Sequence, residues 1–428
     1  MSLRSLLMPA ISQYLLSRGR VERLRLRAEK ARLAGHQRHQ VHYFHQVDDP
    51  YCALTAAVLP ELAARYDIDI VPHLVAPPGD DVAPARDLLV AYSRKDAALL
   101  AGHHGLAFTD PGMQPLPGAV QNAQGLLLNA IEVGSFNLLA PEITRQLWAP
   151  EGSRTMPQSR TSPEALAAHL QASTALRDKL GHYLGATFFY GGEWYWGIDR
   201  LHHLEQRLQS LNAQRPGVHR LMFAPDADLD QPRPASHPGQ IDFFFSLRSP
   251  YSAIVAPRVF RLGQLTGVPV RLKYVLPMVM RGLPVPANKR RYISLDTARE
   301  AHARGIPFGR VNDPLGRPVE RGLSIMPYAE RAGLGQAYVL SFMRGVWAEG
   351  LDAGSDRSLR HMVERAGLHW AEARQAMEDP AWRQTAEAHR AEMVGLGLWG
   401  VPSFHVHDTV VWGQDRLWAV QAALFDHT

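Results

Sequence analysis

Cysteine is almost absent from this sequence: the 428 residues include a single one, Cys52. One cysteine cannot form an intrachain disulfide, so the composition excludes a disulfide-stabilised domain and disfavours a thiol oxidoreductase. No apolar run reaches the roughly 18 residues that a membrane span needs. The N-terminus also lacks an uninterrupted apolar core followed by a small-residue cleavage site. We therefore predict no secretory signal and expect a cytoplasmic protein.

Net positive charge is lacking outside the N-terminus. Residues 1–40 carry nine Lys or Arg and two Glu, a net charge of +7, whereas the whole chain has a formal net charge of +5. We therefore expect no nucleic-acid-binding domain. Apolar side chains precede the basic stretch at roughly helical spacing: Leu3, Leu6, Leu7, Ile11 and Leu15. This pattern predicts a basic helical extension over 1–40, separable from the folded body. Residues 1–35 could meet a membrane surface or an anionic partner; a solvated basic helix packed on its own domain is the alternative.

One motif occurs twice, 200 residues apart. Residues 41–56 read VHYFHQVDDPYCALTA and residues 241–256 read IDFFFSLRSPYSAIVA. The same register, without a gap, places Tyr92 on Tyr292, Asp96 on Asp296 and Phe108 on Phe308. We interpret the pattern as a duplication. It predicts a domain at 41–211, a linker rich in Pro, Asp and Gln at 212–240, and a domain at 241–428.

Each half shows the same predicted order of elements. A buried strand is expected at Val41–Val47 and Ile241–Leu247, then a helix that begins at a Pro after an N-capping Asp or Ser, then a second parallel strand. Helical patterns follow, with single helices expected over Pro327–Glu349 and Ser355–Arg390. Two short strands and a helix close each half. The predicted fold class is α/β, as two tandem thioredoxin-like domains that each hold a helical insertion.

The second half carries three short motifs with this order: SPYS at 249–252, GVP at 400–402 and WGQDR at 412–416. With them it resembles the DsbA-like branch of the thioredoxin fold that contains kappa-class glutathione transferases and 2-hydroxychromene-2-carboxylate isomerases. The resemblance runs from Ile241 to about Ala423 and is fainter over 41–211. It implies glutathione as co-substrate and a small electrophilic molecule as substrate.

Ser249 is the candidate catalytic residue. It stands at the strand-to-helix corner, followed by Pro250 and Tyr251 of the same motif. A glutathione thiol must be a thiolate to attack, and a hydroxyl donor together with the free N–H groups of a helix start stabilises that anion. Serine before proline is also an ordinary N-cap, so capping alone is the alternative.

The remaining candidate binding residues come from the late motifs. Pro402 matches the family's cis-proline, whose preceding residue, here Val401, would pair through its backbone with the extended peptide of glutathione. Gln414 and Asp415 match positions that hold the γ-glutamyl end. Asp415 could instead cap the last helix, as Asp199 would in the first half.

The first half departs from this pattern and is predicted to be a degenerate copy. Asp49 takes the place of Ser249; at neutral pH an ionised Asp49 cannot donate a hydrogen bond and would repel a thiolate. Cys52 is expected to be buried and inert. Thr187 takes the place of Pro402, so the bond from Ala186 to Thr187 is expected to be trans.

Two departures also affect the second half: Ser246 stands where the family usually has an acidic residue, and Arg248 directly precedes Ser249. None of the 20 His has an acidic or cysteine partner at metal-ligand spacing, so we expect no metal. The sequence predicts a glutathione-dependent isomerase or transferase and does not separate the two reactions. The alternative is a non-catalytic scaffold or interaction protein. The sequence leaves the oligomeric state open.

Overall fold

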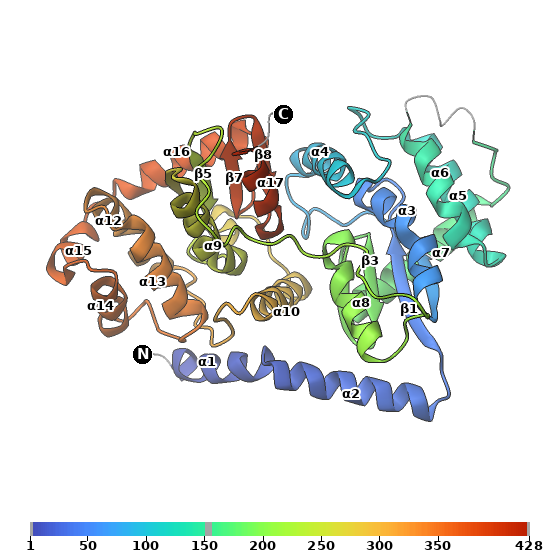
Figure 1. The fold of residues 1–428 in the computed structure, drawn as a ribbon, viewed down its shortest axis with the longest axis horizontal. Helices are drawn as coiled ribbons and strands as arrows, with labels where there is room; N and C mark the ends of the chain where they lie inside the picture. The colour runs from blue at the N-terminus through green and yellow to red at the C-terminus, as the bar shows by residue number, and fades with distance from the viewer. Residues whose placement is uncertain (1–2, 150–155, 426–428) are drawn as a thin grey trace. The chain divides into compact units, whose positions relative to one another are not determined.

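The computed structural model of the chain describes residues 3–149 and 156–425. These residues form a mixed α/β protein with two four-stranded sheets (Figure 1). The chain divides into two compact units, one sheet in each. We call residues 23–225 with 286–292 the N-terminal unit, and residues 1–22, 226–285 and 293–428 the C-terminal unit. The domain boundaries predicted at residues 40, 211 and 240 stay predictions.

The N-terminal unit is built on a sheet with the strand order β2-β1-β3-β4. Strand β1 pairs with β2 in parallel and with β3 antiparallel, and β3 and β4 form a hairpin. Helix α6 packs on α3 and on α5. The elements are α2 (Arg18–Ala34), β1 (His39–His45), α3 (Pro50–Arg65), β2 (Ile68–Leu74), α4 (Arg86–His104), α5 (Pro117–Glu132), α6 (Phe136–Trp148), α7 (Pro163–Leu180), β3 (Thr187–Tyr190), β4 (Glu193–Trp196) and α8 (Leu201–Ser210).

The C-terminal unit repeats this layout with the strand order β6-β5-β7-β8. Its β5–β6 pair is parallel and its other two pairs are antiparallel. Helix α13 packs against α9, as Figure 1 shows. The elements are α1 (Leu3–Leu15), β5 (Ile241–Phe245), α9 (Pro250–Thr266), β6 (Val270–Tyr274), α10 (Ala287–Ala303), α11 (Arg317–Ser324), α12 (Met326–Arg331), α13 (Gly335–Trp347), α14 (Asp356–Arg365), α15 (Trp370–Ala376), α16 (Trp382–Gly395), β7 (Ser403–Val406), β8 (Thr409–Trp412) and α17 (Leu417–Ala422).

Aromatic side chains of the central strands form the core of each unit. In the C-terminal unit Phe243 stacks on Phe404 with ring centroids 5.3 Å apart. In the N-terminal unit Tyr43 lies against Phe188 at 5.0 Å. All five residues of β5 are buried. A strand covered on both faces selects a continuous apolar run, and this is why the run at 241–247 could be recognised in the sequence.

Two long helices expected in the C-terminal half are each broken. The predicted helix Pro327–Glu349 is the pair α12 and α13, separated at Gly333, whose φ is 70°. The predicted helix Ser355–Arg390 is the series α14, α15 and α16. Its first break falls at Gly367, with φ 86°, and its second lies just before α16, at Pro380. Glycine ends a helix by taking the left-handed conformation, and proline cannot continue one, so periodicity alone overestimated both lengths.

The predicted N-terminal extension is helical and contacts the units. The Val311 amide donates to Ser12 Oγ at 2.8 Å, and Leu16 is buried. In the N-terminal unit Arg25 forms two hydrogen bonds with Glu193, at 2.6 and 2.8 Å. The opposite side of α1 exposes large apolar side chains: Leu7, Met8, Ile11, Tyr14 and Leu15. Across residues 3–149 and 156–425, none of the helices is both long and apolar enough to cross a membrane.

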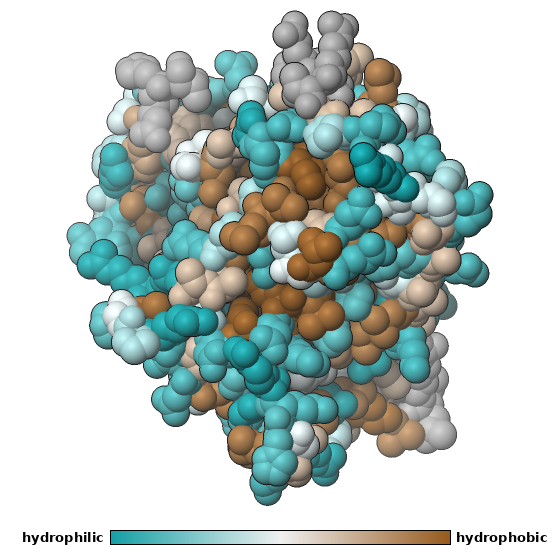
Figure 2. All heavy atoms as spheres, turned by 90° about the vertical axis from the view of Figure 1, so that its right-hand side faces the viewer, coloured by the Kyte–Doolittle hydropathy of each residue, from teal (hydrophilic) through white to brown (hydrophobic). Residues whose placement is uncertain are grey.

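A second apolar surface belongs to the helical insertion of the N-terminal unit. Figure 2 shows apolar side chains gathered on the side of the molecule where α5 and α6 lie. The exposed large apolar residues of this stretch are Met113, Leu116, Val133, Leu138 and Leu139. A helix face that only contacts solvent does not need this many exposed large apolar side chains.

Candidate functional site

The first candidate residue, Ser249, caps helix α9. It has extended backbone angles, and its Oγ accepts a hydrogen bond from the Ser252 amide at 3.1 Å. The same hydroxyl reaches the backbone carbonyl of Val401, as a donor, at 3.5 Å. Two candidate residues from positions 152 apart in the chain therefore meet at one corner. The distance of 3.5 Å makes the hydrogen bond from Ser249 to the Val401 carbonyl weak, because hydroxyl hydrogen bonds are normally about 2.5–3.0 Å long.

The segment opposite this corner starts strand β7. The peptide bond between Val401 and Pro402 is cis, as predicted, and it is the only cis bond among the residues that the structure describes. The bond between Ala186 and Thr187 is accordingly trans, also as predicted. The Pro402 carbonyl accepts from the Gly413 amide at 2.9 Å, which ties the segment to the end of β8.

Pro250 and Tyr251 open α9. The Tyr251 hydroxyl donates to Asp296 on α10 at 2.7 Å. In the N-terminal unit the Tyr51 hydroxyl donates to Asp96 at the same distance, 2.7 Å. Tyr251 thus has a structural use that both halves share. Whether Pro250 and Tyr251 also contact a ligand stays a prediction.

Gln414 and Asp415 differ in what their side chains reach. Gln414 is buried; its Oε1 accepts from Arg258 at 2.9 Å, and its Nε2 donates to Glu300 at 3.0 Å. Arg258 in turn pairs with Asp228 through two hydrogen bonds of 2.7 Å. The Gln414 side-chain amide therefore connects Arg258 of α9 with Glu300 of α10. The Asp415 carboxylate is 20% exposed and lies 3.5 Å from the Arg416 guanidinium.

The two departures from the family pattern have physical counterparts here. Ser246 is buried, where an ionised side chain would be costly. Arg248 pairs with Asp313 through two hydrogen bonds of 2.8 Å. This bidentate pair directs the guanidinium at a carboxylate 65 positions away. Sequence spacing gave no signal for Asp313.

In the N-terminal unit Asp49 occupies the equivalent corner. Its Oδ1 accepts from the Tyr51 amide at 3.0 Å, so it caps α3 as Ser249 caps α9. Burial raises the pKa of Asp49 to about 7. The expectation that Asp49 is fully ionised at neutral pH is therefore wrong, because the surrounding protein disfavours the charged form. Near neutral pH the carboxyl group is close to half protonated and can donate.

Cys52 is buried and inert, as predicted. Its side chain is fully shielded from solvent, and its Sγ accepts from the amides of Gln46 at 3.1 Å and Ala186 at 2.9 Å. Burial raises the pKa of the Cys52 thiol well above its ordinary value. A thiol that is neither ionised nor accessible cannot attack a disulfide or an electrophile.

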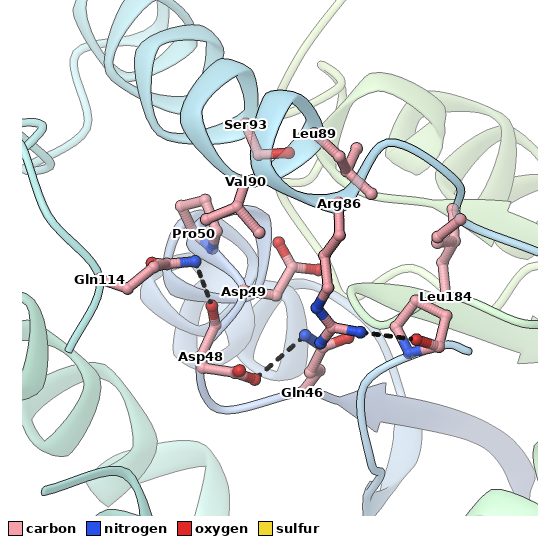
Figure 3. Close-up of a pocket in the computed structure, with 12 residues that line it drawn as sticks. Gln46, Asp48, Asp49, Pro50, Arg86, Leu89, Val90, Ser93, Gln114 and Leu184 are labelled. Carbon is pink, nitrogen blue, oxygen red and sulfur yellow. Dashed lines mark hydrogen bonds between the residues drawn. The ribbon is translucent and has the colours of Figure 1, made fainter. Parts of the chain in front are cut away.

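A hollow of about 490 Å³, counting the part open to solvent, lies at the Asp49 corner (Figure 3). The segment before α3, the first turns of α4 and the residue Leu184 enclose it. The sequence did not predict this hollow, because several residues that line it lie far along the chain from the Asp49 motif. It is lined by Gln46, Asp48, Asp49, Pro50, Pro78, Ala83, Arg86, Leu89, Val90, Ser93, Gln114 and Leu184.

Residues 240–425 match the family model described as the DSBA-like thioredoxin domain. The C-terminal half is a DsbA-like thioredoxin domain. The resemblance inferred from the motifs is thereby confirmed for this half. The N-terminal half has a similar arrangement of sheet and helices and lies outside the match.

The similar proteins include isomerases and a reductase. A 2-hydroxychromene-2-carboxylate isomerase from Sphingobium xenophagum is 24% identical over 194 residues, which is 44% of this chain and 98% of the relative. A solved structure of selenomethionine 2-hydroxychromene-2-carboxylate isomerase is 24% identical and covers 43% of this chain and 93% of its own, with a TM-score of 0.38. A structure of the cytosolic disulfide reductase DsbM from Pseudomonas aeruginosa with GSH is 22% identical and covers 42% and 96%, with a TM-score of 0.35.

Proposed function

We propose that the C-terminal DsbA-like domain is a glutathione-dependent isomerase that acts on a small electrophile, with the glutathione thiolate held at Ser249. The observation that carries the proposal is the corner itself: in a DsbA-like domain whose curated relative is an isomerase, the Ser249 hydroxyl caps α9 and faces the Val401 carbonyl at 3.5 Å. A transferase would use the same thiolate. The relative's name favours isomerisation.

The proposed chemistry begins with the thiolate. Ser249 turns its proton from the Val401 carbonyl to the sulfur, and the positive end of the α9 dipole lowers the energy of the anion. The sulfur then adds to one carbon of a conjugated double bond, and the electron pair moves onto the conjugated carbonyl oxygen. Rotation about the resulting single bond and expulsion of the thiolate give the isomer. Atoms and electrons balance without an oxidant.

Binding of the peptide part is assigned to the remaining candidates. The Val401 backbone would pair with extended glutathione beside Pro402. The Asp415 carboxylate would meet the ammonium group of the γ-glutamyl end. Gln414 would act by holding Arg258, since its own amide is already bonded on both sides.

We also propose that the two halves are diverged copies of one domain. The support is that equivalent elements carry the same side-chain contact in the same 200-residue register: Tyr51 to Asp96 and Tyr251 to Asp296, each at 2.7 Å. A disulfide reductase function is disfavoured because the one cysteine is buried and lies in the other unit.

The decisive experiment compares two serine caps in the full chain. Ser249 and Ser355 both cap helices of the C-terminal unit, and Ser355 Oγ accepts from the Ser358 amide at 3.3 Å. Ser249→Ala and Ser355→Ala should each cost about 1 kcal/mol of unfolding free energy. Only Ser249→Ala should raise the pKa of the bound glutathione thiol. This pKa is measured from the ultraviolet absorbance of the thiolate.

The control experiment measures whether the unsubstituted protein binds glutathione. Saturating glutathione should raise its melting temperature, since a ligand at 100 times its Kd adds about 2.7 kcal/mol. If glutathione leaves the melting temperature unchanged, or if both alanine variants hold the thiol alike, Ser249 is only a cap. The non-catalytic scaffold then becomes the better description.

A further inference from the structure

The hollow at Asp49 is lined by three groups that can donate a hydrogen bond to a ligand, of which the first, Arg86, is exposed to solvent. Arg86 is the first; it bonds to the Pro78 carbonyl at 3.1 Å, and among the residues that the structure describes it pairs with no carboxylate. Ser93 is the second; its side chain is 7% exposed, and its hydroxyl has no hydrogen-bond partner in the described parts of the chain.

The third donor is Asp49 itself. Its Oδ2 accepts from the Cys52 thiol at 3.8 Å and its Oδ1 accepts from the Tyr51 amide, so the acid group is fixed at the wall of the hollow and donates to a ligand only when it is protonated. Asp48, the other carboxylate in the wall, accepts from the side-chain amide of Gln46 at 3.0 Å. Figure 3 shows this bond at the base of the hollow, between two residues of the segment that precedes α3.

We propose that this hollow binds a small carboxylic acid as its anion, with Arg86 and Ser93 donating to the carboxylate and Asp49 sharing a proton with it. The Arg86 guanidinium and the Ser93 hydroxyl line the same hollow, and both can donate to an anionic acceptor, whereas a cation would meet the guanidinium. Beside the polar Gln46 and Gln114, the wall has an apolar part that suits a ring or short chain: Pro50, Pro78, Ala83, Leu89, Val90 and Leu184.

The shared proton gives the site a pH dependence of known sign. The titratable groups that face Asp49 are Asp48, Cys52, Tyr43 and Arg86. The pKa of Asp49 is raised to about 7, whereas those of Tyr43 and Cys52 are raised well above their ordinary values, so both stay neutral. The carboxylate should therefore bind to protonated Asp49, and binding should weaken by about tenfold between pH 6 and pH 8.

The test uses the full chain and benzoate as the probe, with benzyl alcohol as the uncharged control, by isothermal titration calorimetry. Benzoate should bind with a Kd about tenfold lower at pH 6 than at pH 8, and benzyl alcohol should bind more weakly at both. Arg86→Gln should raise the Kd for benzoate at least tenfold. Arg145→Gln, on α6 and paired with Glu142 outside the hollow, is the matched control and should leave it unchanged.

Two further variants separate the proton from the shape. Asp49→Asn should fold, keep the bond to the Tyr51 amide and make benzoate affinity nearly independent of pH. If Asp49→Asn fails to fold, Ser93→Ala gives the second measurement and should weaken benzoate several-fold. The proposal is overturned if benzoate does not bind at pH 6, if Arg86→Gln and Arg145→Gln bind it alike, or if Ser249→Asp abolishes its binding, since that variant would place the ligand in the other unit.

Discussion

The corners at Asp49 and Ser249 share their backbone and differ in their electrostatics. Both residues cap a helix that begins with Pro, and both are followed by a Tyr whose hydroxyl donates to an Asp at 2.7 Å. Yet one corner presents a neutral hydroxyl that faces a backbone carbonyl, and the other presents a carboxyl with a pKa of about 7 above a buried thiol. The fold fixes where the functional group stands; burial and neighbours decide which chemistry it has.

The largest effect is expected from giving the C-terminal corner the residue of the N-terminal one. Ser249→Asp keeps the cap, and at a pH where the new carboxyl group is ionised it repels a thiolate; loss of one stabilising donor costs about 10²–10³-fold in rate. We expect at least this loss in kcat/KM for the proposed glutathione-dependent isomerisation. Ser355→Asp, at a cap away from the corner, should retain activity. Full activity in Ser249→Asp would reduce Ser249 to a cap.

The next largest effect concerns Asp49 and pH. Its pKa is raised to about 7, so the folded state holds the proton more tightly than the unfolded state. The resulting stability is fully present below about pH 4 and is lost as the pH rises through 7. Asp49→Asn cannot ionise, so the variant should gain about 3 kcal/mol relative to the parent between pH 4 and pH 8. Urea unfolding at the two pH values measures this; parallel curves for both proteins would mean that Asp49 titrates normally.

The shared Tyr–Asp contact tests the similarity of the corners. Tyr51→Phe and Tyr251→Phe each remove one donor to a buried carboxylate, because Asp96 and Asp296 are 3% and 2% exposed. A hydrogen bond to a charged group is worth about 1.5–3 kcal/mol, so each variant should lose that amount in chemical unfolding. A loss in only one half would show that the equal distances conceal different roles.

The sequence predicted those features that depend on local pattern. The hairpin strands Thr187–Tyr190 and Ser403–Val406 lie where two short closing strands were predicted in each half, because turn residues separate short apolar runs. The Asp49 pKa was missed, because its burial depends on the folded surroundings and not on the motif. The partner of Arg248 was missed for the same kind of reason: Asp313 comes from a loop that no periodicity connects to the corner.

The smallest expected effect concerns the contact between helix α1 and the rest of the C-terminal unit. The sequence predicted that residues 1–35 could be removed without a change in melting temperature, but Ser12 Oγ accepts from the Val311 amide at 2.8 Å. Ser12→Ala leaves that amide without its partner and should cost about 1 kcal/mol of unfolding free energy. Ser210→Ala is the control: its Oγ donates to the Arg207 carbonyl at 2.7 Å on an exposed residue, and its loss should cost less. If the two variants unfold alike, α1 does not contribute to the stability of the unit that holds Ser249, and the comparison of the corners can be made without it.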